Sequence, residues 1–84
     1  MAVILDRAQI KSALALTDPA VSSFLDMETG QVVQLIEGDT SSEQEALGQM
    51  VMDGVGDRFR YIPGGNPEAD DSAIDSWLGA EGIK

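Results

Sequence analysis

Carboxylates are the side chains with which this sequence could do chemistry. Its 84 residues include 15 aspartates and glutamates but no histidine and no cysteine. Asp26 and Glu28 flank one predicted turn, and paired carboxylates act as general acid and base when burial drives their pKa values apart. A simpler interpretation is stronger, because Glu28 is a turn residue and Asp26 has arginines available as partners. We therefore expect no catalytic residue.

The lack of histidine and cysteine excludes whole classes of site. Without imidazole or thiol the chain cannot build Ser-His-Asp or Cys-His catalysis. Zinc–thiolate centres and His-ligated metals are excluded for the same reason. The sequence therefore predicts a protein that is not an enzyme and has no cofactor.

Two groups of acids offer the oxygen ligands that calcium and magnesium prefer. They are Glu37, Asp39 and Glu43, and Glu68, Asp70 and Asp71. Neither group has the spacing of an EF-hand loop. Most of these acids stand where helix caps and first-turn charges are expected. A carboxylate-based divalent-metal protein or enzyme subunit is thus an alternative hypothesis.

Arg58 and Arg60 follow a segment, residues 37–57, that contains six acids and no base. Together with Tyr61 they could line an anion pocket. In a chain of net charge −10, isolated arginines are more often internal ion-pair partners, and we expect at least one of them to contact Asp26. The nearby Pro63-Gly64-Gly65 lacks the lysine and Ser/Thr of a phosphate-binding loop.

Charge and length limit the partners. A strongly acidic surface repels phosphate, so neither nucleic acid nor an anionic membrane is expected to bind. No apolar run approaches the ~20 residues of a membrane span. The segment from Met1 to Leu5 lacks the basic start of a signal peptide, so we expect a cytoplasmic protein. An apolar content of 43% at this length predicts one globular domain over residues 1–84.

The first predicted helix has a clear beginning and end. Asp6 can cap it, with Gln9 completing a capping box and Leu5 and Ile10 forming a hydrophobic staple. It must end before Pro19, because the residue preceding a proline avoids the helical region.

Two further helices are predicted later in the chain. Residues 40–42 are three successive N-cap candidates for the second helix, and each is followed three residues on by Glu or Gln. Gly48 weakens the middle of this helix, which we explain by the close approach of another element. Asp71 or Ser72 caps the last helix, and Gly79 ends it.

Residues 24–36 predict a β-hairpin centred on Gly30. We expect a three-residue loop, with Gly30 in the left-handed region as a bulge. This loop gives the pairs Leu25–Val33 and Met27–Gln31, with Leu35 on their face and Phe24, Asp26, Val32 and Ile36 on the other.

A short third strand is predicted at about residues 58–62, where apolar and basic residues alternate. Phe59 and Tyr61 should lie on one face of it. The expected fold is therefore α+β: a small three-stranded antiparallel sheet, with a hairpin at about 23–36 and the strand at about 58–62, packed by two or three helices. Trp77, on the last helix, should contribute the largest single area of core.

Two of these segments resemble a known family. The segment F-L-D-M-E-T-G-Q-V-V from Phe24 is similar to the Y-L-D-L-E-T-G-E-V-V-like hairpin of uncharacterised protein family 0158, a bacterial family of unknown function. The segment D-R-F-R-Y-I-P from Asp57 resembles that family's D-R-Y-I-P. The resemblance implies the same order of elements, and it implies no activity and no catalytic residue.

The sequence thus predicts a small acidic non-catalytic protein-interaction module. Its partner is an unknown protein, and a homodimer is possible because open sheet edges need cover. The residues expected on the interaction surface are Glu43, Glu45, Asp53, Arg58, Arg60 and Tyr61. A second alternative is an acidic inhibitor or antitoxin-like protein that blocks a basic site.

Overall fold

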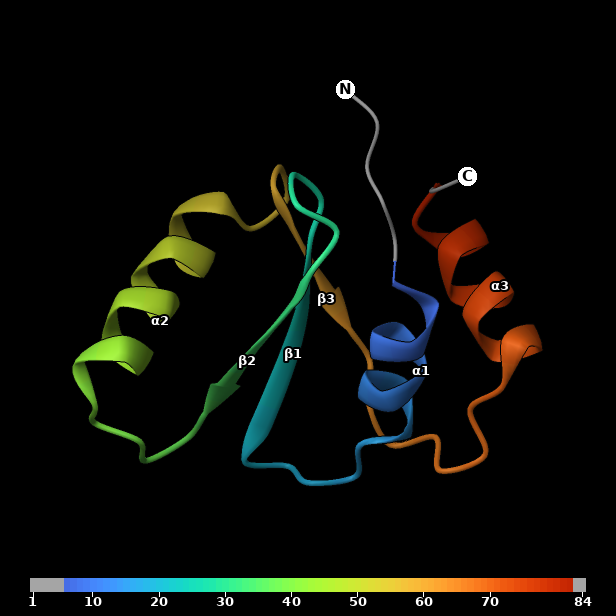
Figure 1. The fold of residues 1–84 in the computed structure, drawn as a ribbon, viewed down its shortest axis with the longest axis horizontal. Helices are drawn as coiled ribbons and strands as arrows, with labels where there is room; N and C mark the ends of the chain where they lie inside the picture. Colours follow the sequence, from blue (N-terminus) through green and yellow to red (C-terminus); the bar gives the residue numbers. More distant parts are fainter. Residues whose placement is uncertain (1–5, 83–84) are drawn as a thin grey trace.

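Three helices and one antiparallel sheet make up the computed structural model, which describes residues 6–82 (Figure 1). The elements in chain order are α1 Arg7–Ala15, β1 Val21–Asp26, β2 Val32–Ile36, α2 Ser42–Gly54, β3 Phe59–Ile62 and α3 Asp71–Ala80. The strand order is β2-β1-β3, with β1 antiparallel to both neighbours. The predicted α+β class and element order are confirmed.

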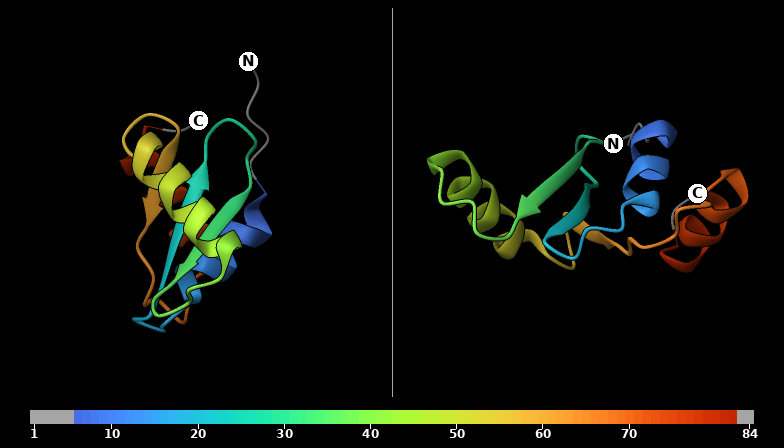
Figure 2. Two further views of the ribbon diagram at one scale, coloured as in Figure 1. Left: turned by 90° about the vertical axis from the view of Figure 1, so that its left-hand side faces the viewer. Right: turned by 90° about the horizontal axis from the view of Figure 1, so that it is seen from below.

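The helices lie on both sides of the sheet. Figures 1 and 2 show α2 on one side and α1 and α3 on the other, with α3 beyond α1. The main core joins the sheet to α1 and α3; it consists of Ile10, Ala13, Leu14, Leu25, Ile62, Ala69, Ile74, Trp77 and Leu78. Val51 of α2 and Phe59 of β3 are also buried but lie outside this cluster. A second, smaller apolar contact therefore holds α2 against the sheet.

The hairpin register differs from the predicted one by one residue. Leu25 pairs with Val32 and Phe24 with Val33. Gly30 does adopt the expected positive φ of 76°, but the loop holds four residues, because Asp26 N donates to Gln31 O and Gly30 N donates to Asp26 O. A one-residue slip moves every side chain of a strand to the opposite face. Val32 consequently joins the core side of the sheet, and the predicted faces of β2 were wrong.

Acidic and hydroxyl side chains begin all three helices. Asp6 accepts from the backbone N–H groups of Ala8 and Gln9, and Ser41 accepts from Gln44 N. The third helix is capped by Asp70, one residue before the predicted candidates, and it continues through Gly79 to Ala80. Leu5, half of the expected hydrophobic staple, lies outside the described residues.

Gln44 does not close the expected capping box with Ser41. Its amide reaches the outer edge of β2 instead, where Oε1 accepts from Ile36 N at 2.9 Å and Nε2 donates to Gln34 O at 3.1 Å. Asp39 supplies the missing acceptor for Ser41 N at 2.9 Å. One side chain of α2 thus satisfies backbone groups that an edge strand would leave open.

Replacing Gln44 with glutamate tests this edge contact. Gln44→Glu keeps the acceptor for Ile36 N but loses the donor to Gln34 O, which we expect to lower the free energy of unfolding by about 1 kcal/mol at neutral pH. Protonation of the introduced carboxyl restores a donor, so the deficit relative to wild type should shrink below about pH 4. Urea denaturation at the two pH values measures both effects. A deficit that is independent of pH would contradict the proposed geometry.

Gly64 and Gly48 have different surroundings: one faces backbone atoms and the other faces open space. A Cβ at Gly64 would lie 2.6 Å from the carbonyl oxygen of Leu16. The same loop donates from Gly65 N to Leu16 O and from Asn66 N to Leu14 O, so it lies directly against the end of α1. A Cβ at Gly48 would meet nothing within 4 Å, and the expectation of a close neighbour there was wrong.

These surroundings predict opposite effects for the same substitution. Gly64→Ala should destabilise the fold by about 2 kcal/mol, because its new methyl meets backbone that cannot move aside. Gly48→Ala should stabilise it by roughly 0.5–1 kcal/mol, since alanine is the better residue inside a helix. Thermal or urea unfolding of the two variants measures the difference. Equal effects at the two positions would show that the loop around Gly64 does not lie against the end of α1.

Candidate functional site

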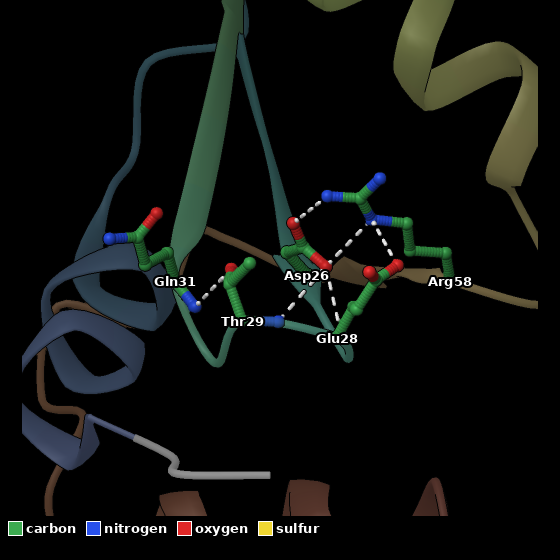
Figure 3. Close-up of polar contacts among 5 residues, drawn as sticks. All are labelled: Asp26, Glu28, Thr29, Gln31 and Arg58. Carbon is green, nitrogen blue, oxygen red and sulfur yellow. Dashed lines mark hydrogen bonds and ion pairs between the residues drawn. The ribbon is translucent and has the colours of Figure 1, made fainter. Parts of the chain in front are cut away.

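Asp26 and Arg58 form the central ion pair of the structure (Figure 3). Asp26 is buried at the end of β1, and Arg58 precedes β3. Arg58 Nε donates to Asp26 Oδ1 at 3.0 Å and Nη2 donates to Oδ2 at 2.8 Å, a bidentate geometry. Glu28 Oε2 lies 3.4 Å from Arg58 Nε. The prediction that an arginine contacts Asp26 is confirmed.

The same carboxylate organises the hairpin turn. Asp26 Oδ1 accepts from the backbone N–H groups of Glu28 at 2.9 Å and Thr29 at 3.4 Å. The hydrogen bonds from Arg58 lower the pKa of Asp26 most, and those from the turn lower it further. Burial acts in the opposite direction, and the resulting pKa is about 2. This carboxyl is therefore ionised at neutral pH and has no proton to donate as a general acid.

The depressed pKa predicts a defined pH dependence of stability. Asp26 has a pKa of about 2 in the fold and about 3.9 when unfolded, so the pair contributes roughly 2 kcal/mol above pH 4. This contribution is lost as the pH falls from about 4 to about 2. Asp26→Asn should remove it, so urea unfolding should separate the variant from wild type at pH 6 but bring them together near pH 2. A constant gap would contradict this assignment.

All three arginines are engaged by acids outside residues 37–57. Arg58 pairs with Asp26 and Glu28, Arg7 with Asp75 at 2.8 Å, and Arg60 with Glu81 at 3.9 Å. Arg60 Nη1 also donates to the carbonyl oxygen of Gly56. The predicted site residues Arg58 and Arg60 therefore lie in internal ion pairs, as the simpler interpretation expected.

The six acids in and around α2 have no such ion-pair partner in the part of the chain that the structure describes. We name this set the α2 acidic layer: Glu37, Asp39, Glu43, Glu45, Asp53 and Asp57. All six are exposed, and none takes part in an ion pair within residues 6–82. The predicted surface residues Glu43, Glu45 and Asp53 thus all belong to α2, and this helix carries no base.

Large apolar side chains are exposed beside this layer. Met52 is 72% exposed, Tyr61 56% and Val55 52%. Tyr61 also packs edge-on against Phe24, with ring centroids 5.5 Å apart. Tyr61 was predicted from the sequence as a surface residue, whereas Met52 and Val55 were not. The available signal for Met52 was its place directly after Val51, which puts it on the side of the helix away from the buried stripe.

A shallow groove of about 500 Å³ lies at the end of the sheet where α2 ends, β3 begins and α3 ends. It is lined by Val55 and Gly56 after α2, by Phe59, Arg60 and Tyr61 of β3, and by Ala80 and Glu81 at the end of α3. Residues 80 and 81 were not predicted as part of a site, because no local sequence pattern indicates that the end of α3 meets β3.

The acids proposed as metal ligands do not converge. Within residues 6–82 no group of three or more acids is placed to hold a metal ion. Asp39 accepts from Ser41 N, which lowers the pKa of Asp39, and Asp70 accepts from Ala73 N. Both carboxylates are helix and turn caps, so neither predicted ligand triad forms a site.

Across the described residues, no helix combines the length and the apolar character needed to cross a membrane.

Comparison of the chain with models of protein families, with curated proteins and with solved structures found no match. The resemblance of the hairpin segment to uncharacterised protein family 0158 therefore stays a prediction.

Proposed function

We propose that this protein is a small non-catalytic interaction module that binds a basic partner protein through the α2 acidic layer. The observation that carries the proposal is the distribution of the arginines. Each of them is held by an acid elsewhere, which leaves the layer's carboxylates without a cation within the described chain.

Electrostatics supports this role beyond solubility alone. Charge kept for solubility is commonly interspersed with the opposite sign. Here six acids occupy residues 37–57 without one base, three of them on α2 and three in the segments before and after it, so their potentials reinforce one another. Such a surface accelerates encounter with a positively charged partner and disfavours an acidic one.

A heterologous partner is better supported than the homodimer considered above. Open sheet edges were the reason to expect self-association. Gln44 occupies part of the β2 edge, and at β3 a bridge from Val55 to Phe59 and the bond from Gly56 N to Phe59 O occupy part of the other. Two copies would also each carry a net charge of −10.

Charge neutralisation on matched surfaces tests the proposal. Glu43→Gln, Glu45→Gln and Asp53→Asn, combined in one variant, should weaken capture of a basic partner roughly tenfold, because each exposed pair contributes about 0.5 kcal/mol. The matched control combines Asp18→Asn, Glu68→Gln and Asp71→Asn, which removes the same charge outside the layer.

Affinity capture followed by titration of the recovered partner, at about 0.05 M and 0.5 M salt, measures the effect. Binding should be strong at low salt for wild type and for the control, and weak for the α2 variant. Equal loss in the two triple variants would indicate that net charge alone is responsible. A partner whose binding is insensitive to salt and to both variants would refute the role of the layer.

A further inference from the structure

We infer that the groove between Val55, Tyr61 and Ala80 receives an apolar side chain from a lysine- or arginine-rich segment of the partner. This inference rests on the proposed function, because it takes the partner to be basic. The acidic layer provides only charge contacts, and the groove would add an apolar contact beside them.

The groove has the composition of an anchoring site. Three of its lining residues are large and apolar: Phe59, which is buried, and Val55 and Tyr61, which are about half exposed. Ala80, at the end of α3, adds a small apolar side chain to the same lining. Contacts that dominate binding are apolar or aromatic anchors enclosed by a polar rim, and this groove provides both parts.

Local charge selects the chemistry of the occupant. Glu81 lines the groove, and Asp53 and Asp57 lie two residues to either side of Val55. Among residues 6–82, two cations lie at the groove: Arg60, which lines it, and Arg58, whose guanidinium carbon lies 5.1 Å from the centre of the Phe59 ring. Both are already engaged, since Arg60 donates to Gly56 O and lies 3.9 Å from Glu81, and Arg58 pairs with Asp26 and Glu28. The uncompensated charge around the groove is negative, which favours a basic segment.

The same charges disfavour a second copy as the occupant. Pairing two copies at this groove would bring Asp53 and Asp57 of each chain toward those of the other. Like charges facing each other across an interface are repulsive, and this repulsion adds to that between two chains of net charge −10.

Two synthetic lysine-rich peptides serve as probes, identical except for a central leucine in one and a central serine in the other. Fluorescence anisotropy at low salt measures their dissociation constants with the full chain. The leucine peptide should bind roughly tenfold more tightly than the serine peptide, because its side chain leaves water.

Ala80→Leu fills the groove from a helical position that favours leucine. It should bring the affinity for the leucine peptide down to that for the serine peptide and leave the serine peptide unchanged. The control Ala8→Leu, at an exposed position on α1, should change neither. Unchanged far-ultraviolet circular dichroism confirms that both variants are folded.

The outcomes separate the two proposals. If the triple α2 variant weakens both peptides but leucine brings no advantage, or Ala80→Leu leaves that advantage intact, the groove inference is overturned and the acidic layer stands. If the triple variant affects neither peptide, the proposed function fails first. A wild-type dimer in light scattering that Ala80→Leu abolishes would assign the groove to a second copy and overturn the inference.

Discussion

The carboxylate of Asp26 is the group on which the rest of this structure depends. It accepts hydrogen bonds from two backbone N–H groups of the turn and from two nitrogens of Arg58, while its own backbone pairs across the hairpin. One buried residue therefore fixes the length of the hairpin loop, the register of β2 and the position of Arg58, where the chain enters β3. A buried charge is tolerated only when it is this fully paired.

This pairing also shapes the molecular surface. Because Arg58 is committed to Asp26 and Glu28, it does not neutralise the neighbouring α2 acidic layer. Arg60 is drawn in the same way toward Glu81 and Gly56, and Arg7 toward Asp75. In a chain with few cations, internal ion pairing leaves one helix uniformly acidic, and that helix lies beside exposed apolar side chains.

Several features were predictable because they depend on local chemistry. The cap at Asp6, the left-handed Gly30 and the buried stripe of α1 follow from short-range hydrogen bonding and helical periodicity. The ion pair of Asp26 with an arginine followed from the scarcity of cations. The register was not predictable, because loops of three and four residues are both compatible with one glycine. The side-chain bonds of Asp26 select the four-residue loop.

Composition alone determined that this chain has no imidazole or thiol chemistry and a strong excess of negative charge, since neither property depends on folding. Its periodicities determined the order of helices and strands. Only the tertiary structure decided that Gln44 bonds to the β2 edge instead of capping its own helix, and that Ala80 lines the same groove as Val55 and Tyr61. The groove joins residues far apart along the chain, and Gln44 has two alternative sets of hydrogen-bond partners. In each case the outcome depends on how the helices and strands pack in three dimensions.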